Sequence, residues 1–165
     1  ASMALKRSGV RASSAPPIND LNYVDKLMSN KPSNIIFFDG YCILCNGFID
    51  FLFSRDKRKK LFFSALESET ALNIFAQLGY SSEEMSELDS LVYVRNGQVK
   101  IRSDAVLSII SDLGGTYRVS AIFYLAPKFV RDFIYDQIAS KRYKWFGKRA
   151  MCRVPNADEK NRILE

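Results

Sequence analysis

Two cysteines in C-x-x-C spacing, Cys42 and Cys45, carry the clearest chemistry in this sequence. They follow a mostly apolar run, 34–38, and open a stretch with helical periodicity, so they lie where a strand passes into a helix. The unpaired N–H groups at a helix N-terminus stabilise a thiolate, and this spacing brings both sulfurs within one helical turn. The arrangement predicts a dithiol that exchanges disulfides with other thiols.

Other interpretations of the C-x-x-C pair remain open at this point. Half of a four-cysteine zinc site has the same spacing, and so do two small buried residues. If Cys152 folded back onto the pair, three thiolates and Asp39 could hold a metal, but the sequence lacks the second C-x-x-C pair of a zinc ribbon. We expect no metal and no cofactor other than a Cys42–Cys45 disulfide, with Cys152 packed or weakly redox-active.

The two cysteines have different expected roles. Cys42 should be the attacking thiolate, because it is nearer the helix start and more exposed, and Cys45 should be the resolving thiol. Asp39 has three interpretations: its negative charge could raise the thiol pKa by repulsion, its carboxylate could accept the Cys45 proton, or it could cap the turn before the helix. The chain contains no histidine, which excludes a Cys–His nucleophile pair and every histidine metal site.

The elements that position this pair follow from periodicity and turn signals. Strand 34–38 is almost wholly apolar and should be central in a sheet. Asn96-Gly97 predicts a hairpin, Ser103 a helix N-cap, Gly79 a helix end and Pro127 the first turn of a long terminal helix. The remaining predicted elements are a short helical stretch at 21–28, helices at 42–55, 67–78 and 103–113, and strands at 61–65, 91–94 and 98–101.

Each predicted helix has an apolar face that should contact the core. These faces are Ile43, Phe48, Phe51 and Leu52 in the first helix, Leu72, Ile74, Phe75 and Leu78 in the second, and Val130, Phe133, Ile134 and Ile138 in the terminal one. The order strand, helix, strand, helix, hairpin, helix predicts an α/β, thioredoxin-like fold. Its mixed sheet should have about four strands, the first two parallel and the hairpin antiparallel, with a C-terminal helical extension.

The string from Asp39 to Cys45, DGYCILC, resembles the signature of the DCC family of predicted thiol-disulfide oxidoreductases. The resemblance covers roughly 35–155 and implies a thioredoxin-like fold, with Cys42, Cys45 and Asp39 as catalytic residues. Thioredoxins carry a cis-proline before the third strand that helps to hold a partner's chain, and this chain departs from them by having Asp89 there. Further matching positions, some with auxiliary roles, are Asp89-Ser90, Ser103-Asp104-Ala105, Leu113-Gly114-Gly115, Arg142-Tyr143, Trp145-Phe146-Gly147, Cys152 and Pro155.

Length and composition indicate one globular domain of 165 residues with 47% hydrophobic residues, and the sequence has no run long enough to be a transmembrane segment. We expect a disordered tail at 1–20, the thioredoxin-like domain at 21–155 and a polar tail at 156–165. Residues 1–17 are basic, rich in serine and free of acidic residues, which is typical of a transit peptide. This favours an organelle, plastid ahead of mitochondrion, although Ala1-Ser2 before Met3 could be an artificial addition.

The charge pattern bears on partners, since both ends of the chain are basic and the middle is acidic. The basic stretches 57–60 and 141–153 accompany no nucleic-acid-binding motif, so we expect protein dithiol or disulfide partners and no nucleic acid. The alternative is a non-catalytic adaptor docked in a larger organelle complex. Tyr143 and Trp145, among basic residues, would then form a docking edge, unless these aromatic side chains cover the core of the protein itself.

Overall fold

The computed structural model describes residues 33–81, 84, 91–151, 156 and 159–164. The expected N-terminal tail and the helical stretch at 21–28 lie outside the described residues, as do Asp89, Ser90 and Cys152. None of the described helices is long and apolar enough to cross a membrane.

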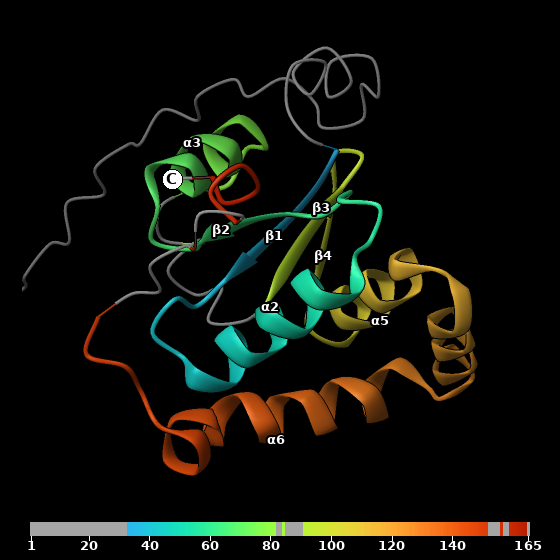
Figure 1. Ribbon diagram of the computed structural model, residues 1–165. Helices are drawn as coiled ribbons and strands as arrows, with labels where there is room; N and C mark the ends of the chain where they lie inside the picture. Colours follow the sequence, from blue (N-terminus) through green and yellow to red (C-terminus); the bar gives the residue numbers. More distant parts are fainter. Residues whose placement is uncertain (1–32, 82–83, 85–90, 152–155, 157–158, 165) are drawn as a thin grey trace, which may run out of the picture.

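A four-stranded mixed sheet forms the centre of the molecule, in the order β2-β1-β3-β4 (Figure 1). β1 runs parallel to β2 and antiparallel to β3, and β4 pairs antiparallel with β3. The predicted thioredoxin-like α/β fold is therefore confirmed. The strands are β1 (Asn34–Phe38), β2 (Phe62–Ala65), β3 (Val92–Arg95) and β4 (Gln98–Ile101).

β1 is central because both of its faces are apolar and covered by helices. Ile36 and Phe38 pack with buried residues of α2 (Ile43–Arg55) and α5 (Arg102–Leu113). On the opposite face, Ile35 and Phe37 pack against α3 (Glu69–Gln77). The alternation of side chains along a strand thus divides the core into two layers, with α2 and its N-terminus on the α5 side.

Glycine marks two boundaries where it was expected. Asn96 and Gly97 have φ values of 49° and 77° between β3 and β4, the left-handed pair that a two-residue hairpin requires. Gly79 has a φ of 86° just after α3. Both the hairpin and the end of the second helix are therefore confirmed.

The predicted inward faces of the first two helices were partly wrong. Ile43 is 41% exposed, because buried Asn46 donates 2.8 Å hydrogen bonds to the carbonyls of Gly40 and Cys42, which rotates the α2 core face to Asn46, Ile49 and Leu52. Leu72 is 47% exposed, because α3 begins after Ser68 and buries Ala71, Ile74 and Phe75. The buried residues of α3 follow the i, i+3, i+4 spacing of one helix face, so Leu72, one position after Ala71, points outward.

Ser103 does not cap the third helix. α5 begins at Arg102, its N-cap Ile101 makes no side-chain capping bond, and the Ser103 hydroxyl donates to Asp132. The serine therefore fastens α5 to the terminal helix instead of satisfying a helix N-terminus.

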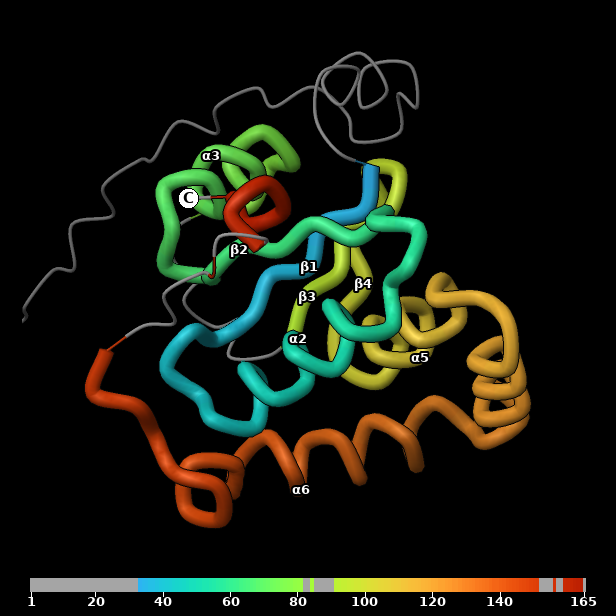
Figure 2. The backbone as a smooth tube through the Cα atoms, in the orientation of Figure 1, coloured from blue at the N-terminus to red at the C-terminus, as the bar shows by residue number. Residues whose placement is uncertain are grey.

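A 3₁₀ segment, η1 (Gly115–Leu125), was not predicted and leads into α6 (Lys128–Phe146), which begins after Pro127. α6 crosses the side of the molecule formed by α2 and α5 (Figure 2). Arg131 Nη1 donates to Asp104 Oδ1 at 2.8 Å, and Tyr135 Oη accepts a 2.9 Å bond from the Leu91 N–H. The predicted apolar face of α6 stays largely open, since its members Val130, Phe133, Ile134 and Ile138 are 37–64% exposed.

The described part of the C-terminal segment, which was expected to be a polar tail, extends the edge of the sheet. The Phe63 N–H donates to the Arg162 carbonyl at 2.8 Å, and the Leu164 N–H donates to the Phe63 carbonyl at 2.7 Å. Arg162 also forms a buried ion pair with Asp56. Residues 159–164 are therefore part of the folded unit, beside β2 and α3 (Figure 2).

Candidate active site

The turn between β1 and α2 is organised by Asp39. Its Oδ1 accepts hydrogen bonds from the N–H groups of Tyr41, at 2.9 Å, and Cys42, at 3.2 Å. This is the geometry of an Asx turn, in which the side chain replaces a backbone acceptor. The carboxylate therefore holds the loop that delivers Cys42 to the helix, as the turn interpretation of Asp39 anticipates.

Cys42 occupies the N-cap of α2, with φ −76° and ψ 120°, and its Sγ accepts a hydrogen bond from the Cys45 N–H at 3.2 Å. Both thiols are free, so the structure holds the pair as a dithiol. A negative charge on the Cys42 sulfur would face this N–H and the positive end of the helix dipole. The location of the pair at a strand-to-helix junction agrees with the sequence-based expectation.

The expected exposure of Cys42 is wrong. Its side chain is 0% exposed, whereas Cys45 is partly exposed. The cover comes from the chain after α6: Lys148 forms an antiparallel bridge with Cys42, and the Arg149 N–H donates to the Tyr41 carbonyl at 2.8 Å. We call this segment, residues 147–149, the covering segment. Its cover could not be foreseen because it comes from more than 100 residues away.

Gly147 lets the covering segment turn back from α6 onto the dithiol turn. Its φ is 88°, a conformation that residues with a Cβ rarely adopt. A Cβ on this residue would also lie 3.3 Å from Cδ1 of Ile43. The position therefore favours glycine both for its backbone angle and for the close approach to α2.

Two residues of α6 complete the site and were not among the predicted site residues. Arg142 Nη2 lies 3.3 Å from Asp39 Oδ2, and the Tyr143 hydroxyl donates to the same oxygen. Burial, followed by the hydrogen bond to Asp39, raises the pKa of Tyr143 to about 12. The resemblance brought Arg142-Tyr143 to notice as matching positions, but sequence spacing gave no sign that they meet Asp39.

Cys45 carries the proton of the pair more firmly than an ordinary thiol. Burial raises its pKa most, then the hydrogen bond to Cys42, then the nearby charges of Cys42 and Asp39, while Arg142 acts in the opposite direction. Cys45 therefore keeps its proton while it lies within hydrogen-bond reach of the Cys42 sulfur. A second thiol this close to the first is what sequential disulfide exchange requires.

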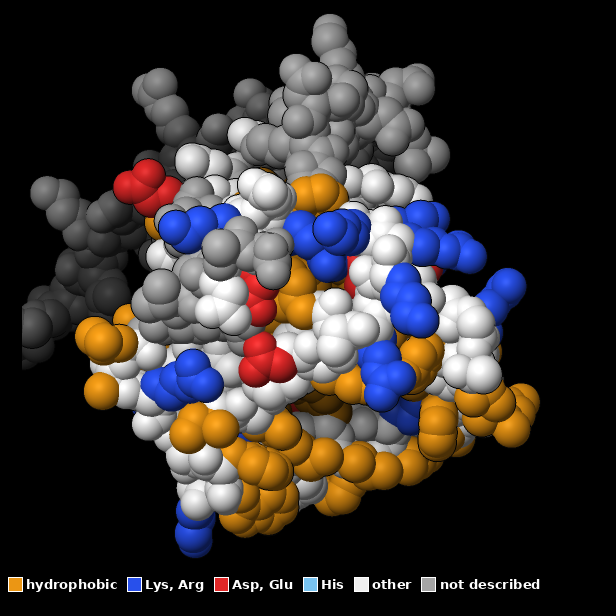
Figure 3. Space-filling view, in the orientation of Figure 1, with side chains coloured by type: hydrophobic (Ala, Val, Ile, Leu, Met, Phe, Trp, Pro, Cys, Tyr) orange, Lys and Arg blue, Asp and Glu red, His pale blue; other side chains and the backbone are white. Residues whose placement is uncertain are grey.

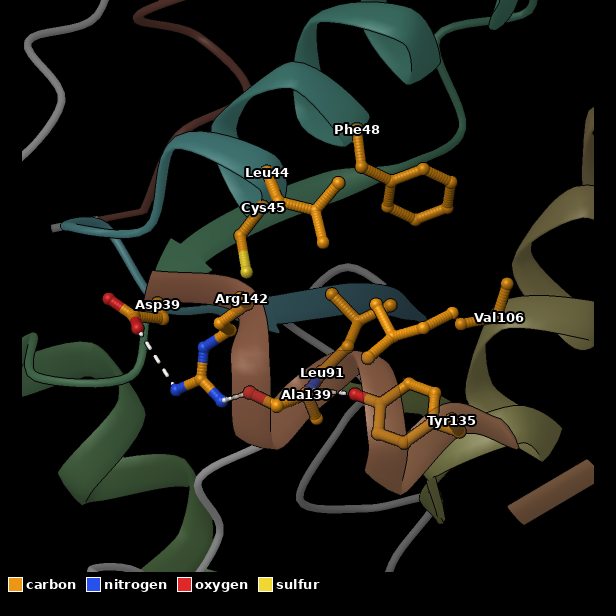
Figure 4. A pocket seen from close by; sticks show the side chains of 10 residues that line it. Asp39, Leu44, Cys45, Phe48, Leu91, Val106, Tyr135, Ala139 and Arg142 are labelled. Carbon is orange, nitrogen blue, oxygen red and sulfur yellow. Dashed lines mark hydrogen bonds and ion pairs between the residues drawn. The ribbon is translucent and has the colours of Figure 1, made fainter. Parts of the chain in front are cut away.

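An apolar cavity of about 260 Å³ opens beside Cys45, between α2 and α6. Figure 4 shows the Cys45 sulfur directed into this space, with the Asp39–Arg142 pair at one end and Tyr135 at the other. A small sulfur-bearing or apolar group could therefore reach Cys45 from the solvent side. The lining residues are Asp39, Leu44, Cys45, Phe48, Leu91, Val106, Tyr135, Ile138, Ala139 and Arg142.

The described residues contain no cluster of three or more His, Cys, Asp or Glu side chains that could hold a metal ion. Asp89, Ser90 and Cys152 fall outside those residues. Their auxiliary roles, and the expectation that Cys152 is packed or weakly redox-active, stay predictions.

Comparison with known proteins agrees with this geometry. Residues 36–148 match the model of the family described as "DCC1-like thiol-disulfide oxidoreductase". The chain is 38% identical over 133 residues to "Uncharacterized protein YuxK" of Bacillus subtilis (strain 168), covering 81% of this chain and 95% of the relative. It is 36% identical over 121 residues to "DCC family protein At1g52590, chloroplastic" of Arabidopsis thaliana, covering 73% of this chain and 69% of the relative. No solved structure matches the chain significantly.

Proposed function

The chain belongs to the DCC1-like thiol-disulfide oxidoreductase family, and from that premise we propose that it exchanges disulfides with protein partners through Cys42 and Cys45. The observation that carries the proposal is the 3.2 Å hydrogen bond from the Cys45 N–H to the Cys42 sulfur at the N-cap of α2. This bond gives the sulfur of the first cysteine a backbone donor at the helix N-terminus and keeps the second cysteine within one turn of it. A purely structural chain has no need of that second sulfur.

The proposed reaction has two exchange steps. The Cys42 thiolate attacks one sulfur of a partner disulfide, forming a mixed disulfide, and the other partner sulfur leaves as a thiolate that takes up a proton. Cys45 then loses its proton and attacks the Cys42 sulfur, which closes the Cys42–Cys45 disulfide and releases the second partner thiolate. Two electrons pass from the dithiol to the partner, and the reverse sequence oxidises a partner dithiol.

Asp39 serves in this proposal as a positioning residue. Its two oxygens are occupied by the turn on one side and by Arg142 and Tyr143 on the other, which leaves it the task of holding the Cys42 loop against α6. Its negative charge also helps to keep the proton on Cys45. The covering segment must move aside before a partner can reach Cys42, because that sulfur is fully buried at rest.

Insulin reduction with a dithiol as electron donor tests the proposal. Wild-type protein should accelerate it, Cys42→Ser should abolish the acceleration, and Cys45→Ser should accumulate a mixed disulfide on Cys42, visible by non-reducing electrophoresis and released by dithiol. Cys152→Ser is the matched control and should retain activity. If the wild-type protein is inactive and partners are recovered only without covalent capture, the chain is a docked adaptor instead.

A plastid location is the finer part of the proposal. It is supported by the basic, serine-rich, acid-poor composition of residues 1–17 and by the chloroplastic relative, while the other reported relative is bacterial. A fluorescent reporter fused behind residues 1–32 should enter plastids in plant cells. A reporter that stays in the cytosol or enters mitochondria would contradict the plastid assignment.

A further inference from the structure

The side of the molecule formed by η1 and α6 exposes an unusual amount of apolar surface. Seven strongly exposed side chains, each 57–83% exposed, define what we call the apolar face: Val119, Ile122, Phe123, Leu125, Phe129, Phe133 and Trp145. In Figure 3 hydrophobic side chains form a band along the lower edge of the molecule, where Figure 1 shows α6. This surface lies outside the dithiol site described above.

The concentration of exposed hydrophobic side chains on one side of the molecule needs an explanation. Among the described residues, the only exposed large hydrophobic side chains outside 119–151 are Ile43 and Leu72, and they are less exposed, at 41% and 47%. Scattered exposed hydrophobic residues are ordinary, but a contiguous patch marks a surface that is covered by a partner or a membrane. The aromatic and leucine content of the face is that of helices that lie in a membrane interface.

The charges around the apolar face are almost all basic. Lys141, Lys144, Lys148 and Arg149 are exposed at the C-terminal end of α6 and just beyond it. The acidic side chains of α6 are engaged with the rest of the fold. Asp132 accepts from Ser103 and pairs with Lys128 at 3.2 Å, and Asp136 pairs with Arg102 at 3.5 Å. The surface therefore presents positive charge next to apolar side chains, the complement of an anionic lipid surface.

The backbone of this side also suits a lipid interface. α6 has 19 residues, so its N–H and C=O groups are satisfied within the helix apart from the ends. It cannot span a bilayer, but it can lie along one with its apolar side chains inserted. A second copy of the chain is less suited as occupant, because a two-fold contact would bring two basic surfaces together without acidic partners.

We propose that the apolar face of η1 and α6, with its basic C-terminal end, binds the surface of membranes that contain anionic lipids, with α6 lying along the bilayer. The opposite side of α6 holds Asp39 through Arg142 and Tyr143, so membrane binding would place the dithiol close to the bilayer. The proposal is independent of the redox chemistry, since neither Cys42 nor Cys45 belongs to the face.

Co-sedimentation of the full chain with vesicles tests this proposal. Binding is expected to vesicles of phosphatidylcholine mixed with phosphatidylglycerol, to weaken with added salt, and to be much lower with phosphatidylcholine alone. Leu125→Ala and Phe129→Ala should each weaken binding about tenfold. Leu72→Ala, which removes an exposed leucine on α3, is the matched control and should leave binding unchanged.

Charge variants separate binding to anionic lipid from nonspecific hydrophobic adsorption. Lys144→Glu should weaken binding about fivefold, and Lys60→Glu, an exposed lysine between α2 and β2, should have a much smaller effect. A Cys42→Ser, Cys45→Ser double variant should bind as the wild type does. Failure to bind the anionic vesicles overturns the proposal, and so does a dimer in light scattering that Leu125→Ala dissociates, because that result assigns the face to a second copy.

Discussion

Each end of α2 carries a buried Asp–Arg pair, and the two pairs have different roles. Before the helix, Asp39 pairs with Arg142, and after it, Asp56 pairs with Arg162. Both aspartates also accept a backbone N–H, and both arginines come from more than 100 residues away in the sequence. The pairs thus tie the two C-terminal segments, α6 and 159–164, to opposite ends of one helix.

The two ion pairs differ in the side chains that surround them. The Arg162 guanidinium lies over the rings of Phe53 and Phe63, and its Nε donates to the Leu61 carbonyl at 3.0 Å, so this pair serves as a clasp at the sheet edge. The Asp39 pair lies beside two thiols and shifts the pKa of Cys45. One pair therefore fixes structure alone, while the other fixes structure and also sets the charge that the dithiol experiences.

The largest expected effect comes from breaking the clasp. Arg162→Ala leaves Asp56 buried without its partner and should lower the free energy of unfolding by about 3–5 kcal/mol, measured by urea denaturation. Lys160→Ala, an exposed neighbour, is the control and should change it by less than about 0.5 kcal/mol. An Arg162→Ala protein as stable as the control would show that this pair is not a clasp.

Replacing each aspartate by asparagine separates the two roles. Asp39→Asn and Asp56→Asn each keep an acceptor for the backbone and should cost about 1–3 kcal/mol of stability. Only Asp39→Asn should lower the pKa of Cys45, because it removes a charge that raises it. The pH dependence of Cys45 alkylation, in a chain with Cys42→Ser and Cys152→Ser, measures this. An equal shift from Asp56→Asn would erase the distinction.

The dithiol end of α2 should also make stability depend on pH. Cys45 keeps its proton in the folded state above its ordinary pKa of 9.0, whereas the unfolded chain releases it. The stability of the reduced protein should therefore fall by up to about 1.4 kcal/mol per pH unit between that value and about pH 10. Cys45→Ala should flatten this slope, and Ser54→Ala, at the other end of α2, should not. Equal slopes in all three proteins would contradict the raised pKa.

The smallest expected effect concerns the covering segment. Arg149→Pro removes the N–H that donates to the Tyr41 carbonyl, one hydrogen bond worth about 1 kcal/mol, and should speed alkylation of Cys42 about fivefold. Arg149→Ala keeps that N–H and should react as the wild type does. If both variants expose Cys42 equally, the side chain and not the backbone bond holds the segment down.

Local signals explain how much of the fold was predictable. Asn96-Gly97 between two apolar runs favours a two-residue hairpin. Strand 34–38 is apolar on both faces, which favours a central position in the sheet. These two signals were enough to predict the hairpin and the central strand. The α2 face was not predictable in this way, because its phase is set by Asn46, a polar residue buried by hydrogen bonds to Gly40 and Cys42. Hydrophobic periodicity gives no weight to such a residue.

The site was predictable in its sulfur chemistry but not in its long-range contacts. C-x-x-C at a strand-to-helix junction placed Cys42 and Cys45 correctly. The burial of Cys42 by Lys148 and the meeting of Asp39 with Arg142 depend on how α6 packs against α2 and α5. A basic aromatic stretch near the end of a chain is ordinary surface composition, so the sequence alone could not show that the covering segment buries Cys42.

Redox titration of the Cys42–Cys45 pair tests the central claim most directly. Protein with Cys152→Ser is equilibrated in buffers of graded thiol and disulfide content, alkylated and weighed by mass spectrometry. The two sulfurs should oxidise together as one two-electron couple, with a midpoint between about −120 and −270 mV, the range of dithiol oxidoreductases. Two thiols that stay reduced across that range, or that oxidise independently of each other, would contradict the claim that this pair is a redox-active disulfide.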